Sequence, residues 1–346
     1  MTTESLNAAT PPIETKQTPT RTMNQKPVFV VPNKTVINFN SGFGHKYLCD
    51  DMTFTAGSAC PYSCAFCSVP DTMRKQKPWH KKHGVVGNHQ DIVIRRANPV
   101  EVARQQLLAL PEHKRRSRKV IYASALTDVA ANMELVRETV EICKVIFEMT
   151  GWDVRLLSKS NLLPKVAEGI EAAAPHVPNS TDWSQRVIFG VSTGTLDDKI
   201  AGAFEQGTPL VSKRIASLHW LQDHGFRTFG MVCPSLPQND YDRFAQEMAA
   251  ALRYDKCEHV WAEVINLRGE SFTRTINALR GARLNDLAEA VQIISTDKAE
   301  WELYARSTFL AHANHVPPGK LRFLQYVTKS SRAWWTDQIQ NGAVVL

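Results

Sequence analysis

Residues 60–67 read Cys-Pro-Tyr-Ser-Cys-Ala-Phe-Cys and contain three of the seven cysteines in this chain of 346 residues. They follow residues 52–56, a short apolar run of strand length, so the three thiols are expected on the loop that leaves this strand. A structural zinc site or a fully ligated iron–sulfur cluster takes four protein ligands. Three cysteines on one loop therefore predict either a distant fourth ligand or a metal with one open position.

On both sides of this run, apolar segments of strand length alternate with segments of helical periodicity. The predicted strands are apolar on both faces, which is typical of buried parallel strands, and they comprise residues 52–56, 120–123, 154–157, 187–191, 229–233 and 260–265. Helix-start signals are found at Asn98-Pro99, Asn132 and Asp240. The strict alternation predicts an α/β fold, a partial TIM-like barrel of six β/α units with parallel strands and the site at their carboxyl ends.

The rest of the chain is divided by composition. Residues 1–26 are rich in Thr and Pro with few large apolar side chains, which predicts a disordered N-terminal arm. No Pro/Gly/Ser-rich linker splits the middle of the chain, so the partial barrel is assigned residues 27–295. Residues 296–346 are predicted to form a C-terminal helical extension, in which Trp334 and Trp335 are expected to dock against the domain.

The composition, with 43% apolar and 22% charged residues, is that of a globular protein. No apolar run approaches the length of a membrane helix, and the N-terminus lacks the apolar core of a secretory signal, so we expect a cytoplasmic protein without a membrane partner. The formal net charge of +7 favours an anionic partner without establishing one. An odd number of cysteines in such a chain argues against a disulfide framework.

With the aromatic Phe66 before the last cysteine, the Cys-x3-Cys-x2-Cys spacing resembles the signature of the radical S-adenosylmethionine (SAM) enzymes. The resemblance implies that Cys60, Cys64 and Cys67 hold three irons of a 4Fe-4S cluster, that SAM binds the fourth iron, and that Phe66 lies beside the cofactor. It also implies reductive cleavage of SAM to a 5′-deoxyadenosyl radical that abstracts a substrate hydrogen. The electron would come from an external donor of the flavodoxin or ferredoxin type.

Polar residues follow the second, third and fourth predicted strands. Ser124 and Asp128 come after the second strand, Lys159 after the third, and Ser192 directly after the fourth. Side chains at these strand ends face the mouth of a barrel, where the methionyl end and the ribose of SAM need hydrogen-bond donors and acceptors. Ser124, Asp128, Lys159 and Ser192 are therefore the predicted cofactor contacts.

Within the superfamily, these segments resemble the layout of the group named after spore photoproduct lyase, which are DNA-repair radical enzymes. The resemblance includes residues 205–209 ahead of Arg214 and residues 266–269, and it spans about residues 50 to 270. In that group a lysine on strand three and a serine on strand four contact SAM, which implies these roles for Lys159 and Ser192.

One position departs from that group. The lyase has a hydrogen-donating cysteine just before the Thr/Ser-Asp pair at the end of strand two, where this chain reads Ala125-Leu126-Thr127-Asp128. Photoproduct reversal as such is therefore not implied. Cys233, at the mouth end of strand five, is the cysteine outside the cluster run that could return a hydrogen atom to a substrate radical, and a buried structural thiol is the alternative. Cys143, on the apolar face of its helix, is expected in the core.

Residues 71–91 are predicted to form a long loop after the cysteine run on the active-site face. Five Lys and Arg side chains and Trp79 on this segment could hold a phosphate backbone and stack a base of DNA or RNA, and a solvated lid is the alternative. A second basic run, residues 113–119, is expected on the opposite face as a solvated turn.

Two classes of function remain open from the sequence. The first is a radical SAM enzyme, and a nucleic-acid base is one of its candidate substrates. The second is a nucleic-acid-binding protein with a structural or redox-sensing iron–sulfur or zinc site and no SAM chemistry, and a zinc site would use His80 or His83 as the fourth ligand. The three-cysteine loop favours the first class. The substrate and the oligomeric state are not determined by the sequence.

Overall fold

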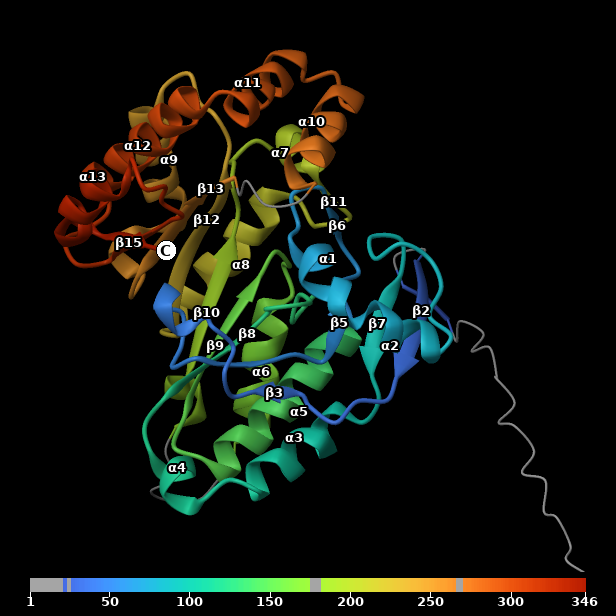
Figure 1. Cartoon of the computed structure of the whole chain (residues 1–346). Helices are drawn as coiled ribbons and strands as arrows, with labels where there is room; N and C mark the ends of the chain where they lie inside the picture. The colour runs from blue at the N-terminus through green and yellow to red at the C-terminus, as the bar shows by residue number, and fades with distance from the viewer. Residues whose placement is uncertain (1–20, 24–25, 175–181, 266–269) are drawn as a thin grey trace, which may run out of the picture.

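A computed structural model describes residues 21–23, 26–174, 182–265 and 270–346. Within these residues the central sheet has nine strands in the order β15-β14-β13-β12-β10-β9-β8-β4-β3 (Figure 1). The six predicted strands are adjacent and parallel, and they are β4 (Met52–Phe54), β8 (Val120–Ala123), β9 (Asp153–Ser158), β10 (Val187–Ser192), β12 (Arg227–Ser235) and β13 (Val260–Val264). The sequence-based prediction of a partial parallel barrel is confirmed.

Helices connect these strands, as the alternation predicts. They include α3 (Pro99–Leu108), α4 (Glu112–Arg116), α5 (Met133–Met149), α6 (Leu163–Ala173), α7 (Asp198–Phe204), α8 (Val211–Asp223), α9 (Tyr241–Leu252) and α10 (Ser271–Gly281). Asn132 caps α5 by accepting bonds from the backbone N–H groups of Glu134 and Leu135 at 3.0 Å, and Asp240 caps α9. Asn98 precedes α3 but makes no side-chain cap bond.

The inner face of the sheet is covered by residues 43–48, which include the short 3-10 helix η1 (Gly44–Lys46). Trp261 on β13 donates to the carbonyl of Lys46 at 2.9 Å, and the guanidinium of Arg155 on β9 donates to the carbonyls of Tyr47 and Leu48. Leu48 packs into the apolar cluster formed by the inward-facing side chains of the strands. Nothing in the sequence pattern of residues 43–48 predicted that they cover the sheet.

A small second sheet lies beside the central one, in the order β1-β2-β7-β5, and its strands are β1 (Arg21–Met23), β2 (Lys26–Val31), β7 (Val93–Arg96) and β5 (Gly57–Ala59). The first strand was predicted as residues 52–56, and its end is wrong. The chain leaves β4 after Phe54 and enters the small sheet before it reaches Cys60. A Cβ atom at Gly57 would lie 2.7 Å from the carbonyl oxygen of Ile94, so glycine is needed where the two strands meet.

The predicted disordered arm, residues 1–26, lies mostly outside the described residues. Its described part forms strands instead, because β1 pairs antiparallel with β2 and the ladder satisfies the backbone of both segments. The other edge of β2 pairs in parallel with β7, which attaches this hairpin to the small sheet. The prediction of disorder is thus wrong for residues 21–23 and 26.

The C-terminal extension is also only partly helical. The helix α11 (Asn285–Thr296) precedes it, and besides α12 (Lys298–His315) and α13 (Arg332–Asp337) the extension contains β14 (Leu321–Gln325) and β15 (Ala343–Val345). These strands extend the central sheet in parallel from β13, where they cover an edge that would otherwise expose unpaired backbone groups. Trp335 is buried, with its ring centroid 5.4 Å from that of Phe309, so the expected docking of the tryptophan pair is confirmed.

The basic segment after the cysteines is not the predicted loop but a set of short helices, α1 (Val69–Thr72), η2 (Met73–Gln76) and α2 (Lys77–Lys82). Pro70 and Pro78 lie in the first turns of α1 and α2, and the buried side chains of Met73 and His80 anchor the segment to the domain. The second basic run lies at the far end of the sheet (Figure 1), as expected, but most of it forms the short helix α4 instead of a turn. Among the described helices, none is both long and apolar enough to cross a membrane.

Candidate active site

The three cysteines of the run line one cavity, together with Tyr62, Ser63, Val69, Pro70, His89 and Gln90. The loop that carries them is held by β6 (Ser63–Cys64), which pairs antiparallel with β11 (Glu205–Gln206) so that Cys64 lies opposite Glu205. The backbone N–H of Ala65 also donates to the carbonyl of Phe204 at 2.8 Å. The loop is thereby attached to the C-terminal end of α7.

Burial controls the acidity of these thiols. It raises the pKa of Cys60 to about 12, and it also raises the pKa values of Cys64 and Cys67. In the described ranges, no group of three or more His, Cys, Asp or Glu side chains is arranged to hold a metal ion. The three thiols line one cavity. This donor set fits a multi-iron cluster, in which each cysteine ligates a separate iron.

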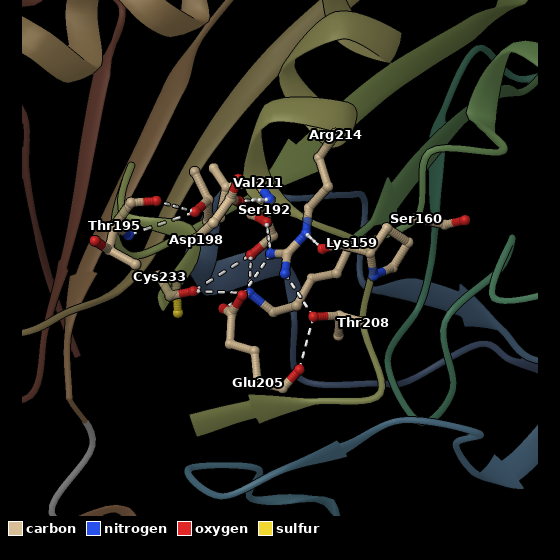
Figure 2. A network of polar contacts seen from close by, with 12 residues as sticks. Lys159, Ser160, Ser192, Thr195, Asp198, Glu205, Thr208, Val211, Arg214 and Cys233 are labelled. Atoms are coloured by element: carbon tan, nitrogen blue, oxygen red, sulfur yellow. Dashed lines mark hydrogen bonds and ion pairs between the residues drawn. The ribbon is translucent and has the colours of Figure 1, made fainter. Parts of the chain in front are cut away.

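Lys159 lies at the centre of a polar network at the mouth of the barrel (Figure 2). Its ammonium donates to Glu205 Oε1 at 2.6 Å, to Ser192 Oγ at 3.0 Å and to the carbonyl oxygen of Cys233 at 3.2 Å. Glu205 Oε2 in turn accepts from the guanidinium of Arg214 at 2.5 Å. The ends of β9, β10 and β12 and the short strand β11 therefore meet at one ammonium group.

The network contains two cations and one carboxylate. Glu205 lies between Lys159 and Arg214, and a second carboxylate, that of Asp128, accepts from the backbone N–H of Lys159. The side chains of Glu205 and Arg214 are 0% and 1% exposed, whereas that of Lys159 is 12% exposed. Lys159 is therefore the member of the network that an anionic group entering from solvent can reach.

Phe66 connects the cysteine loop to this network. The Lys159 ammonium lies 5.2 Å from the centroid of the Phe66 ring, and that ring packs against Phe204 with a centroid distance of 5.5 Å. The structure thus brings three of the predicted cofactor contacts together, namely Phe66, Lys159 and Ser192.

The other two predicted cofactor contacts bond to neighbouring strands. Ser124, in the left-handed region with φ +80°, donates its hydroxyl to the carbonyl of Leu157. The carboxylate of Asp128 accepts from Ser158 Oγ at 2.7 Å and from the backbone N–H of Lys159 at 2.8 Å. Burial raises the pKa of Asp128. Both side chains tie the end of β8 to the end of β9, and direct contact with SAM stays a prediction for them.

Cys233 lies on the side of the network that faces β13. Its carbonyl accepts the bonds from Lys159 and Ser192, and its thiol lies 3.6 Å from the Glu263 carboxylate. Burial and the nearby Glu263 carboxylate both raise the pKa of this thiol, so it is protonated at neutral pH and carries a hydrogen. The predicted catalytic cysteine therefore shares the mouth of the barrel with the predicted cofactor contacts. Cys143 is fully buried in the core, as expected.

The histidines named for a zinc site do not line the cysteine cavity. His80 is buried on α2, and the ring of His83 packs on Trp79 with a centroid distance of 4.1 Å. His89 lines the cavity instead, and burial lowers the pKa of His89 to about 4. Nothing in the spacing of the cysteine run predicted this position of His89.

Other residues around the loop were also missed. Gln90 donates to the carbonyl of Cys64 at 3.2 Å, and the cations Lys26 and Arg274 donate to further carbonyls of the loop. Glu205 had a signal, because it opens the segment 205–209 that takes part in the resemblance. Residues 266–269, the other segment used for the resemblance, lie outside the described residues.

The chain matches no protein-family model and no curated protein sequence. Among solved structures, a mutant of spore photoproduct lyase with dinucleoside spore photoproduct superposes with a TM-score of 0.52 at 13% identity, covering 75% of this chain and 67% of that one. A second mutant of the same enzyme gives a TM-score of 0.51 at 14% identity, over 73% and 66% of the two chains. The fold is similar to that of spore photoproduct lyase.

At this level of identity the likeness to spore photoproduct lyase concerns the fold. It confirms the fold that the resemblance implied, and this chain spans about two thirds of the length of the lyase chains. Streptococcus suis SuiB bound to the precursor peptide SuiA also matches, with a TM-score of 0.40 at 14% identity over 69% and 46% of the two chains.

Proposed function

We propose that this chain is a radical SAM enzyme whose 4Fe-4S cluster is held by Cys60, Cys64 and Cys67. The observation that carries the proposal is the direct connection between two sites at the barrel mouth. The cysteine loop is paired through β6 and β11 to Glu205, and Glu205 is ion-paired to Lys159. When bound, the cluster and SAM supply one-electron cleavage of SAM and a 5′-deoxyadenosyl radical that abstracts a substrate hydrogen.

The chain's own residues would bind and orient SAM. Lys159 offers an ammonium that is 12% exposed beside the buried Glu205, which suits the carboxylate of a methionyl group. The hydroxyl of Ser192 lies 3.0 Å from that ammonium and can bond the same group or the ribose. The Phe66 ring supplies an apolar surface between this network and the cysteines. Ser124 and Asp128 hold the neighbouring strand ends and complete the proposed cofactor contacts.

Cys233 is the proposed hydrogen donor for a substrate radical. Its raised pKa keeps the thiol protonated, and its backbone is held by the same ammonium that we assign to SAM. A substrate radical formed at the mouth would take the hydrogen atom of this S–H group, and the thiyl radical left on Cys233 would regain one electron from the external donor and one proton.

The substrate that the surface supports best is a base in DNA or RNA. The side chains of Arg74, Lys75, Lys77, Lys81 and Lys82 are all exposed on η2 and α2, and Trp79 among them is 43% exposed. This segment continues directly from Val69 and Pro70, which line the cysteine cavity. Positive charge and an exposed indole beside the site suit a phosphate backbone and a stacked base. We place the enzyme in the cytoplasm, with an external electron donor of the flavodoxin or ferredoxin type.

The class is tested on protein purified without oxygen. We expect brown protein that contains iron and sulfide and releases 5′-deoxyadenosine from SAM when dithionite is added. Colourless protein with one zinc per chain would overturn the proposal in favour of a Cys3His site, for which His89 is placed in the cavity.

The substrate is tested separately by isotope transfer. Reduced enzyme is incubated with SAM and deuterated DNA, RNA or small metabolites, and deuterium is followed into 5′-deoxyadenosine. Transfer from nucleic acid supports the proposed substrate. Transfer from a small metabolite alone contradicts it and leaves the radical SAM class standing.

A further inference from the structure

Two cations donate into the backbone of the cysteine loop from segments far apart in the sequence. Lys26 on β2 donates from Nζ to the carbonyl of Tyr62 at 2.8 Å and to that of Cys60 at 3.3 Å. Arg274 on α10 donates from Nε to the carbonyl of Ala65 at 2.9 Å and from Nη2 to that of Cys67 at 2.8 Å. The two side chains therefore hold the loop at both ends, at the first and the last cysteine.

Both cations are partly buried. Lys26 is half-buried, and its charge faces the three cysteine thiols and Asp91. The Arg274 side chain is 19% exposed, and its carboxylate partner Glu270 lies 3.5 Å away with 82% of its own side chain exposed. Burying a charge costs free energy, and a carbonyl can be satisfied by a neutral donor. A positive charge at each end of the loop thus indicates a requirement for charge as well as for hydrogen bonds.

The requirement follows from the redox chemistry of the site. Reduction of an iron–sulfur cluster adds one negative charge, and its potential depends on nearby charge, on hydrogen bonds and on solvent exposure. A cation in a partly buried position acts through a lower dielectric than one in water, so its effect on that added charge is strong. Lys26 and Arg274 donate directly to carbonyl oxygens of the loop itself.

We propose that Lys26 and Arg274 form a cation clamp, which holds the cysteine loop and raises the reduction potential of the cluster. This inference rests on the proposed function. The two members differ in role. Arg274 donates to two carbonyls with a planar fork and fixes the loop geometry, whereas the Lys26 ammonium is a compact charge that acts mainly on the potential. Both are positioning residues, because each acts through the loop rather than on SAM.

The test is a redox titration, monitored by electron paramagnetic resonance, of protein reconstituted with iron and sulfide. Lys26→Met is expected to retain its iron and to show a more negative reduction potential. Lys26→Arg is expected to keep the original potential. Lys34→Met removes an exposed lysine from the same segment and is expected to leave both iron content and potential unchanged. Arg274→Leu is expected to lose iron. Arg274→Lys should restore the potential with incomplete iron content, and Arg280→Leu, at an exposed position of the same helix, serves as its control.

The outcomes separate the two proposals. If the unchanged protein binds no iron and sulfide, the proposed function and the clamp both fail. If it binds the cluster and Lys26→Met titrates at the same potential, the clamp alone is refuted. Should Lys26→Met hold no cluster, Lys26→Gln keeps a neutral donor at the same carbonyls, and an unshifted potential in that variant would equally refute the role of charge.

Discussion

Replacing Lys159 by methionine removes the accessible cation of the barrel mouth while keeping most of the side-chain volume. Of the two cations paired with Glu205, only Arg214 then remains. A hydrogen bond to a charged group contributes about 1.5–3 kcal/mol. Loss of the bond to the SAM carboxylate should therefore weaken SAM binding by about 10- to 100-fold, with the cluster retained.

The same change also affects stability, and the two effects must be separated. Glu205 is fully buried and keeps only Arg214 as its ion-pair partner, so we expect a loss of about 1–3 kcal/mol in the free energy of unfolding. SAM affinity is measured by anaerobic titration calorimetry at a temperature where circular dichroism shows the variant folded. Lys165→Met, at an exposed position on α6, is the matched control. Wild-type SAM affinity in folded Lys159→Met would refute the assignment of this residue.

Four further predictions follow from other parts of the chain. Cys60→Ala, Cys64→Ala and Cys67→Ala should each abolish iron binding and SAM cleavage, whereas Cys143→Ala, in the core, should keep both; iron content and 5′-deoxyadenosine release decide this. Gly194→Ala should disturb the ends of β10 and β12 and weaken SAM binding, because its Cβ would lie 1.8 Å from the carbonyl oxygen of Pro234; Gly202→Ala, with open space around it, should bind normally. Nucleic-acid affinity should fall steeply with salt, and the slope should flatten when Lys75, Lys77, Lys81 and Lys82 become Ala but not when the basic side chains of α4 do. Burial lowers the pKa of His312 to about 4 from 6.5, so the imidazole of His312 binds a proton less readily in the folded chain than in the unfolded chain. The free energy of unfolding is therefore about 3 kcal/mol higher above pH 6.5 than in acid, and this difference is lost as the pH falls from 6.5 towards 4. His312→Phe should lack this part of the pH dependence of unfolding by urea, and an identical pH profile would contradict it.

The parallel core could be predicted because its strands are short, apolar on both faces and separated by helices with clear start signals. Residues 120–123 and 187–191 match β8 and β10 to within one residue. β5 was missed because Gly57–Ala59 carries no apolar alternation and pairs with β7 more than thirty residues later in the chain. β14 and β15 were missed for a related reason, since their strand character depends on completing an edge of the sheet rather than on their own pattern.

In the candidate site, too, some residues could be predicted from local sequence signals and others could not. The cysteine run and the polar strand ends are local signals, and they identified Lys159 and Ser192, which the structure brings within 3.0 Å of each other. Lys26 and Arg274 reach the cysteine loop from β2 and α10, and their roles depend on distances that no local pattern encodes. His89 is similar, because it approaches the cavity only after the intervening helices have folded back.

The short ladder between β6 and β11 makes the two halves of the site thermodynamically linked. Cys64 and Glu205 are backbone partners, so whatever orders one strand orders the other. If cluster binding tightens the binding of a ligand at Lys159 by ordering β6, that ligand tightens cluster binding by the same factor. Apoprotein should therefore bind SAM more weakly than the loss of the iron contact alone would require, and the amides of residues 63–65 and 204–206 should exchange with deuterium as one cooperative unit.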